Sequence, residues 1–213
     1  MKSILFLDRD GVILQEPPQD FQIDHIDKTS FVPGSISGLQ QIALQFDFHK
    51  VLVTNQDGLG TASYPEETFW PFQNLMLRTL EGEGFVFDEI CIDRSFASDP
   101  LPTRKPGIGM VQHYLNNPDF DLNNSFVIGD RLTDMQLAKN MGCKGILLEN
   151  SLHSYDTQTL ASLLDVIALK TSSWNDIVAF LKLGMRKVDH QRYTNETKID
   201  VSLNMDGTGR ADI

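Results

Sequence analysis

Short runs of apolar and β-branched residues alternate along most of the chain with segments of helical periodicity. The apolar runs are typical of buried strands and occupy residues 4–7, 50–53, 89–92, 125–128 and 145–148. Between and after them, apolar residues at helical spacing predict helices over residues 35–45, 65–80, 107–115, 132–140 and 174–182. Strands that alternate with helices predict an α/β fold, a doubly wound, Rossmann-like parallel sheet whose strands end at one edge. The apolar face of the last helix predicts core contacts by Trp174, Ile177, Val178 and Leu181.

The pattern changes after Gly184. Residues 198–206 alternate strictly between apolar and polar side chains, which predicts a half-exposed strand, and a turn is expected at 206–209. A single strand at this place has no evident partner among the other predicted elements. We therefore expect the chain from about Arg186 onward to be poorly ordered.

Length and composition narrow the class of protein. With 213 residues the chain can form one large domain and something smaller, and its formal charge of −11 argues against a nucleic-acid partner, which would need a basic face. No apolar run is long enough to cross a membrane, and a strand begins too early for a signal peptide. We expect a cytoplasmic protein with no membrane or nucleic-acid partner. Its two cysteines, Cys91 and Cys143, are interpreted as buried free thiols.

Two carboxylates follow the first predicted strand directly. Asp8 and Asp10 are separated by one residue, and the carboxyl end of a buried parallel strand is where ligands bind. Two acids so close together favour a bound cation, because both are ionised at low cost only beside positive charge. The alternative is an ordinary strand that ends in an Asp-Gly turn.

Three further polar motifs occur at strand ends or helix starts later in the chain. They are Thr54-Asn55-Gln56, Arg104-Lys105-Pro106, and the acids Asp130 and Asp134. Each motif alone is typical of a turn, a helix cap or an exposed surface. Together they would lie at the same edge of the predicted sheet as the first two acids, which makes the combination specific.

The combination resembles the haloacid dehalogenase superfamily of phosphatases through the segments FLDRDG, VTN, RKP and IGDRLTD. Longer segments are similar to the histidinol-phosphatase family of bifunctional histidine-biosynthesis proteins: EPPQDFQID, FVPG, TNQDGLGT, FQNLM and VIGDRLTDMQLAKNMG. In that family the phosphatase is fused to imidazoleglycerol-phosphate dehydratase, and RYTNETKIDVSLNMDGTG resembles the opening strand of the dehydratase. The resemblance covers essentially the whole chain. It implies a histidinol-phosphatase domain without a large cap over residues 1–168, a C-terminal helix and linker over 169–185, and a dehydratase stub over 186–213.

The resemblance implies an activity, a cofactor and the residues that perform the reaction. The activity is Mg²⁺-dependent hydrolysis of L-histidinol phosphate to L-histidinol and phosphate. Asp8 would attack phosphorus and form an aspartyl-phosphate, while Asp10 would act as acid and then base. The metal ligands would be the side chains of Asp8 and Asp130 and the backbone carbonyl of Asp10.

The phosphoryl oxygens would be bound by Thr54, Asn55 and Lys105. Asp134 would hold Lys105 or a water molecule at the metal. Candidate contacts to the rest of the substrate are Glu16, Asp20, Gln22 and Arg104. For each candidate substrate contact, an ordinary solvated loop residue is an equally good interpretation.

The chain departs from the resemblance in one loop. Many of these phosphatases carry a zinc loop of three Cys and one His before the motif lysine. Here residues 91–106 contain only Cys91, no His, and the acids Asp93 and Asp99. A structural zinc site needs four N or S ligands, so we expect no structural Zn²⁺.

The histidine content also bears on the second activity. The five histidines form no closely spaced pair and are interpreted as surface or core residues: His25, His49, His113, His153 and His190. The dehydratase needs a set of His and Glu metal ligands, so we expect no dehydratase activity from these residues. Self-association would depend on the dehydratase part that is missing here.

Several alternatives stay open. A heptose-bisphosphate 7-phosphatase, or another small-molecule phosphatase of the superfamily, would use the same catalytic set. A phospho-receiver domain carries its acceptor Asp at the end of the third strand, before both the Thr and the Lys in the sequence. Here Asp93 is the candidate at that strand, but it follows Thr54. An EF-hand is excluded because Val12 occupies the third ligand position and no Glu stands at the twelfth. A pure scaffold would leave the four aligned motifs unexplained.

Overall fold

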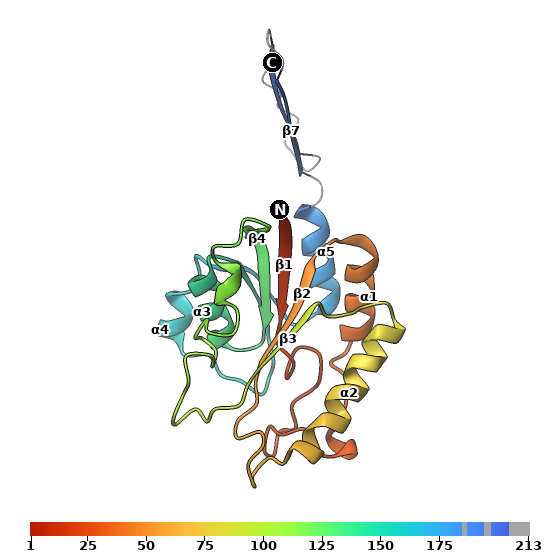
Figure 1. Ribbon diagram of the computed structural model, residues 1–213, viewed down its shortest axis with the longest axis vertical. Coiled ribbons are helices and arrows are strands. Elements are labelled where there is room, and N and C mark those ends of the chain that lie inside the picture. The colour runs from red at the N-terminus through yellow and green to blue at the C-terminus, as the bar shows by residue number, and fades with distance from the viewer. Residues whose placement is uncertain (185–186, 194–196, 205–213) are drawn as a thin grey trace.

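A six-stranded parallel sheet forms the body of the protein in the computed structural model, which describes residues 1–184, 187–193 and 197–204 (Figure 1). The strand order is β3-β2-β1-β4-β5-β6, and every neighbouring pair is parallel. The strands are β1 (Lys2–Leu7), β2 (His49–Asn55), β3 (Glu89–Asp93), β4 (Phe120–Gly129), β5 (Lys144–Leu148) and β6 (Ile167–Thr171). The predicted doubly wound α/β fold is confirmed.

Helices cover both faces of this sheet (Figure 1). The α-helices are α1 (Ser35–Gln45), α2 (Glu66–Gly82), α3 (Leu132–Met141), α4 (Thr157–Ala161) and α5 (Trp174–Gly184), with short 3₁₀ turns η1 (Ile26–Lys28) and η2 (Gln112–Tyr114). Within the described residues, no helix combines the length and the apolar character that a membrane span requires.

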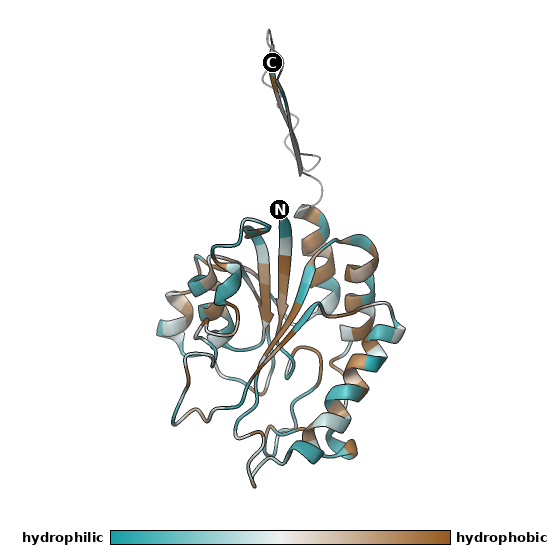
Figure 2. Ribbon diagram, in the orientation of Figure 1, coloured by the Kyte–Doolittle hydropathy of each residue, from teal (hydrophilic) through white to brown (hydrophobic). Residues whose placement is uncertain are grey.

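The alternation of side chains along β1 divides the core in two. Leu5 and Leu7 pack with apolar residues of α1, α2 and α5 on one face of the sheet. Ile4 and Phe6 pack with residues of α3 on the other face. All four are fully buried, and the central strands are correspondingly apolar in Figure 2. Burial on both faces explains why these strands appear in the sequence as continuous apolar runs.

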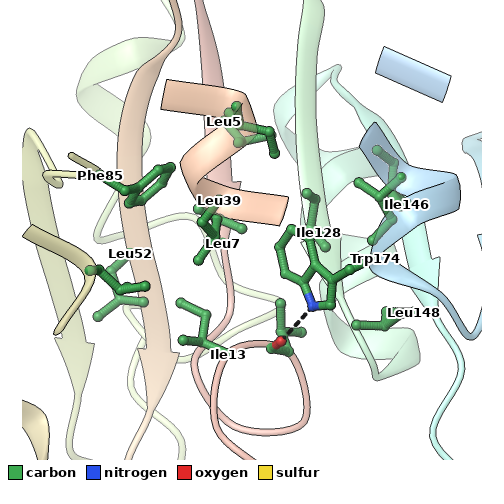
Figure 3. Close-up of a cluster of buried hydrophobic side chains, with 14 of the residues drawn as sticks. Leu5, Leu7, Ile13, Leu39, Leu52, Phe85, Ile128, Ile146, Leu148 and Trp174 are labelled. Carbon is green, nitrogen blue, oxygen red and sulfur yellow. Dashed lines mark hydrogen bonds between the residues drawn. The ribbon is translucent and has the colours of Figure 1, made fainter. Parts of the chain in front are cut away.

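Trp174 at the start of α5 connects the end of the body to the loop that follows β1. Its indole Nε1 donates a hydrogen bond to the backbone carbonyl of Val12 at 3.0 Å, and its ring packs among core side chains (Figure 3). A Cβ on Gly38 would lie 2.8 Å from the indole ring, so α1 approaches the ring closely because this position is glycine. The core contacts predicted for Trp174 and its helical neighbours are confirmed.

The helix predicted over residues 107–115 is wrong. Only the single 3₁₀ turn η2 forms there. Gly107 and Gly109 pack against the carbonyl of Pro102, where a Cβ would lie 2.3 and 2.8 Å from the oxygen, respectively. Their N–H groups bond to Arg104 O and Pro102 O. Glycine is a poor helix former, and these local contacts satisfy the backbone without a helix.

The sequence interpretation also missed β6, which is one of the two edge strands of the sheet. Its side chains alternate between partly buried and exposed along Ile167–Thr171, so it lacks the continuous apolar run of a central strand. The predicted domain boundary after residue 168 falls inside this strand. The short helix α4 was missed as well, and the division of the chain into three parts stays a prediction.

A two-stranded antiparallel hairpin of β7 (Lys187–Tyr193) and β8 (Lys198–Asn204) follows α5 and extends away from the body in Figure 1. The expectation that the alternating strand lacks a partner is therefore wrong, because β7 pairs with it along its whole length. Residue Arg186 and the turn expected at 206–209 lie outside the described residues.

Candidate active site

The predicted polar motifs meet at one edge of the sheet, where the central strands end. Asp8 follows β1, Thr54 and Asn55 end β2, and Asp130 follows β4. Lys105 reaches the same place from the segment after β3. A cavity of about 890 Å³ opens there, and Asp8, Thr54, Asn55 and Lys105 all line it. Parallel strands therefore bring together residues that are far apart in the sequence.

Lys105 is the centre of a buried ion cluster. Its Nζ lies 2.8 Å from Oδ1 of Asp8 and 2.8 Å from Oδ1 of Asp134. The three residues are 4%, 8% and 1% exposed, respectively. Burial alone would lower the pKa of Lys105, but the two carboxylates raise it overall, so the ammonium stays charged. Burial raises the pKa of Asp8 to about 6 against the opposing effect of Lys105.

Asn55 fixes the backbone of Lys105. Its side-chain Nδ2 donates to the carbonyl of Lys105 at 3.2 Å, and its Oδ1 accepts from the N–H of Lys105 at 3.0 Å. Both polar atoms of the Asn55 amide are therefore engaged with the lysine. This contact gives Asn55 a positioning role beside the predicted phosphate-binding one.

Asp10 is oriented by two neighbours to which the sequence interpretation assigned no role. Arg9 donates to both carboxylate oxygens at 2.7 and 3.0 Å, and Gln56 donates at 2.9 Å. Gln56 also donates to Oγ1 of Thr54 at 2.9 Å, so it links the second acid to the predicted phosphate-binding threonine. Arg9 is 1% exposed and lies over the ring of Phe69. Gln56 belongs to the triplet Thr54-Asn55-Gln56 that the sequence analysis selected, so its place was indicated. Arg9 lies within the segment FLDRDG, but nothing in the sequence indicated that it is buried or that it orients Asp10.

Asp130 is the most buried acid of the site, with an exposure of 0%. Among the described residues, its Oδ1 has no hydrogen-bond partner, although Oδ2 accepts from Asn150 and the backbone carbonyl from Tyr155. A Cβ on Gly11 would lie 1.8 Å from Oδ2, so glycine alone lets the carboxylate lie against the loop after β1. Gly11 also has a φ of 74°, which favours glycine.

This arrangement fits a Mg²⁺ ion. Carboxylate oxygens of Asp8, Asp130 and Asp134 lie within 4.8 Å of one another. A buried, unpaired carboxylate oxygen is costly, and a cation would satisfy the one on Asp130. The donors are all oxygen, which Mg²⁺ prefers.

Glu16 forms a buried cluster beside Asp130. It is 6% exposed, bonds to Nη2 of Arg131, and lies 2.7 Å from Nε2 of His153. His153 also lies 3.2 Å from Oδ2 of Asp130, and its ring stacks on Phe21. Burial raises the pKa of Glu16 to about 7, although Arg131 opposes this. The hydrogen bond to Asp130 raises the pKa of His153.

His153 lines the cavity. The sequence analysis interpreted it as a surface or core residue and did not place it at the site. The sequence gave no signal for it, because it stands alone, 137 residues after Glu16, in a loop without a recognisable motif.

The other three predicted substrate contacts, Asp20, Gln22 and Arg104, also line the cavity. Gln22 donates to the carbonyl of Ser63 at 3.2 Å. Arg104 makes a bidentate ion pair with Asp57, with N–O distances of 2.6 and 3.2 Å. It also donates to the carbonyl of Ser95 at 2.8 Å. Both side chains therefore connect loops that surround the cavity. Asp20 lines the cavity too and forms an ion pair with Lys28 at 2.6 Å.

The two cysteines are buried and unpaired, as predicted. Burial raises the pKa of Cys143 to about 12, and burial together with Glu89 raises that of Cys91 to about 12. In the described part of the chain, the close groups of metal-ligand side chains are Asp8/Asp130/Asp134 and Glu16/Asp130/His153. Neither group includes a residue of the loop 91–106, and the absence of structural zinc stays a prediction.

Comparison with known proteins gives three findings. A family model described as HAD-hydrolase-like matches residues 102–163. The histidine biosynthesis bifunctional protein HisB of Bacteroides fragilis is 50% identical over 212 residues, which is 100% of this chain and 56% of that protein. HisB of Spirosoma linguale is 47% identical over 219 residues, 100% of this chain and 57% of that protein. The chain thus spans just over half the length of these curated relatives.

Among solved structures, a D,D-heptose 1,7-bisphosphate phosphatase from B. bronchiseptica, crystallised with magnesium and phosphate, superposes with a TM-score of 0.70. It is 30% identical, and the match covers 85% of this chain and 98% of that chain.

Proposed function

The chain belongs to the haloacid-dehalogenase-like hydrolases, and from this premise we propose that it is a Mg²⁺-dependent phosphatase that hydrolyses L-histidinol phosphate to L-histidinol and phosphate. The observation that carries the proposal is the ion cluster of Asp8, Lys105 and Asp134 at the cavity, with the buried carboxylate of Asp130 beside it. It occurs in a chain that is 50% identical over its full length to part of a histidine-biosynthesis protein.

Asp8 is the proposed nucleophile. Its carboxylate lines the cavity and is held by the ammonium of Lys105, which leaves the second oxygen available for attack on phosphorus. The attack forms an aspartyl-phosphate and releases the alcohol, and water then hydrolyses the acyl phosphate. Phosphomonoesters hydrolyse very slowly unaided, so positioning and charge neutralisation supply most of the acceleration.

Asp10 is the proposed acid and base. It would donate a proton to the departing alcohol oxygen in the first step and accept one from the attacking water in the second. Arg9 and Gln56 hold its carboxylate in place through three hydrogen bonds. Because both partners are fixed in the core or at the end of β2, the carboxyl group stays oriented toward the cavity.

Mg²⁺ would be held by the side chains of Asp8 and Asp130 and the backbone carbonyl of Asp10. When bound, it neutralises the negative charge of the phosphoryl group and of the acids around it. Thr54 and Lys105 would bind the phosphoryl oxygens, and Asn55 would hold the lysine backbone in register. Asp134 would keep the ammonium of Lys105 in place from the opposite side.

Glu16, Gln22 and Arg104 are the proposed contacts to the alcohol part of the substrate. All three line the cavity, which is open enough for a small molecule. Glu16 lies between Arg131 and His153, so its carboxylate is oriented and its negative charge is partly neutralised. Its carboxylate is the proposed contact to the amine or the imidazole of the substrate.

The cellular setting is also part of the proposal. The curated relatives are bifunctional proteins of histidine biosynthesis, and the hairpin β7–β8 stands where the sequence resembles the start of a dehydratase. We infer a cytoplasmic enzyme whose phosphatase part works beside a dehydratase part. Self-association would then take place through the dehydratase part.

Turnover of L-histidinol phosphate and of D,D-heptose 1,7-bisphosphate by the purified chain tests the proposal. The second compound is included because a heptose phosphatase is 30% identical. We expect a kcat/KM for histidinol phosphate at least about a hundredfold higher, loss of activity in EDTA, and recovery with Mg²⁺. A preference for the heptose would replace the proposed substrate, and undiminished activity in EDTA would exclude the metal.

A further inference from the structure

The loop between β3 and Lys105 has little apolar anchoring. Residues 94–102 are largely solvent-exposed, and its two large apolar side chains, Phe96 and Leu101, are 43% and 58% exposed. Yet this loop carries Arg104 and Lys105 to the cavity, where a displacement of about 1 Å from the effective position would weaken their contacts to the substrate. Polar contacts must therefore hold the loop in place.

Asp93, the last residue of β3, makes these contacts. It is 2% exposed. Its Oδ1 accepts from the N–H of Ser95 at 2.9 Å and from the Ser95 hydroxyl, and its Oδ2 accepts from the hydroxyl of Thr103. One buried carboxylate thus joins the first and last turns of the loop. Such hydrogen bonds to an ionised acceptor are among the stronger ones in proteins.

The hydrogen bonds of Asp93 continue directly to the site. Thr103 precedes Arg104, and the carbonyl of Ser95 accepts a hydrogen bond from Nη1 of Arg104 at 2.8 Å. The main chain of Asp93 is fixed as well, because its carbonyl accepts from the N–H of Gln56 at 2.7 Å. The carboxylate therefore lies between the framework of the sheet and both basic residues of the site.

We propose that Asp93 is a positioning residue of the phosphatase: its carboxylate closes the loop 94–103 on Ser95 and Thr103 and so places Lys105 for phosphate binding and Arg104 for contact with the rest of the substrate. The inference rests on the proposed function. Asp93 touches neither the cavity nor the reacting groups, because its side chain is buried and both of its oxygens are engaged. A role as a phosphate acceptor, as in a receiver domain, does not fit this environment.

Steady-state kinetics of Asp93→Ala, with Asp99→Ala as the matched control, test the proposal. Asp99 is an exposed acid in the same loop. We expect Asp93→Ala to raise KM and the inhibition constant of inorganic phosphate about tenfold, with kcat within about threefold of wild type, because the phosphate-binding Lys105 and its neighbour Arg104 lose their fixed place. Asp93→Asn keeps one acceptor oxygen and should recover most of the affinity. Unchanged phosphate affinity in Asp93→Ala, or equal losses in Asp99→Ala, would overturn the proposal.

Smaller changes keep the proposal falsifiable if Asp93→Ala does not fold. Thr103→Val removes a single hydrogen bond, and Thr103→Ser retains the hydroxyl. We expect a KM increase of about threefold in the first variant and wild-type values in the second. Equal KM values in the two variants would contradict the role of the carboxylate.

Two readouts do not depend on the substrate. Calorimetric titration measures the affinity for inorganic phosphate, which depends on the placement of the basic residues. The rate of trypsin cleavage after Arg94 measures opening of the loop. We expect weaker phosphate binding and cleavage at least about fivefold faster in Asp93→Ala or, if that variant does not fold, in Thr103→Val. A wild-type enzyme that does not hydrolyse histidinol phosphate would refute the proposed substrate. The two measurements above would still decide the role of Asp93.

Discussion

The ammonium of Lys105 lies 2.8 Å from Oδ1 of Asp8, and both groups are nearly excluded from water. A buried acid alone would take up a proton, and a buried lysine alone would lose one. Each group keeps the other charged, and Asp134 supports the lysine from a second side at the same distance. The site therefore holds the proposed nucleophile in its ionised form beside a cation that also suits phosphate.

Removal of the buried cation should destabilise the whole domain. Lys105→Met leaves two buried carboxylates without their partner, so we expect the free energy of unfolding to fall by about 3–5 kcal/mol. Urea denaturation at pH 7 measures it. Lys170→Met is the control, because Lys170 pairs with Glu149 at 3.0 Å on the surface and such pairs contribute roughly 0–1 kcal/mol. Equal effects of the two substitutions would show that the ion cluster around Lys105 contributes little to the free energy of unfolding.

Loss of the proposed nucleophile should abolish turnover with little change in the fold. Asp8→Asn replaces one carboxylate oxygen by an amide of similar size, so we expect kcat to fall by at least about 10³-fold. Rapid quench with a ³²P-labelled substrate measures the phosphoenzyme, which should be present in wild type and absent in the variant. A variant that still accumulates phosphoenzyme would place the nucleophile elsewhere.

The effect of Asp10 should depend on the leaving group. Asp10→Asn cannot give a proton to the alcohol, so we expect a loss of about 10²–10⁴-fold with alkyl phosphates. The loss should be much smaller with p-nitrophenyl phosphate, whose leaving group needs no proton. Equal losses with both substrates would mean that Asp10 acts by charge or position and not as an acid.

Gly11 should control metal binding. In Gly11→Ala the new methyl group would collide with Oδ2 of Asp130, so the carboxylate must move away from its place. We expect the rise in Tm on addition of Mg²⁺ to be lost or at least halved. Gly82→Ala is the control, since nothing lies within 4 Å of a Cβ there. A full Mg²⁺ response in Gly11→Ala would argue that Asp130 is not a ligand.

The cysteines should resist alkylation over a wide pH range. Burial raises the pKa of Cys143 to about 12, and burial together with Glu89 does the same for Cys91, so the reactive thiolate is scarce in the native protein. At pH 9 only about one thiol in a thousand is ionised, and the fraction rises as the pH increases. Mass spectrometry after iodoacetamide treatment should find both thiols unmodified in the native protein and both modified in urea. Rapid native labelling at pH 8 would contradict their burial.

The central strands and the four motifs at their ends could be predicted from the sequence because their physical signals are local. An apolar run such as the one before Asp8 is buried on both faces, and parallel strands bring their ends to one edge. The edge strand β6 lacks such a run, and the apolar periodicity over 107–115 did not reveal that the backbone of the glycines at 107 and 109 bonds to the preceding turn instead of forming a helix.

One missed site residue depends on long-range packing: His153 joins Glu16 across 137 positions of sequence, and no periodicity or motif encodes that contact. Arg9 stands inside the segment FLDRDG, but its burial against the ring of Phe69, which lies far along the chain, could not be predicted from that segment. Conversely, the strand partner of β8 was missed because β7 is rich in polar residues, and polar strands have weak sequence signals.

The hydrogen bond from Trp174 to the carbonyl of Val12 spans 162 positions of sequence. During synthesis on the ribosome, the loop after β1 can therefore form this contact only when α5 has left the exit tunnel. The residues around Asp8 are among the first to be translated, yet a nascent chain that stalls before Trp174 lacks the side chain that anchors their loop.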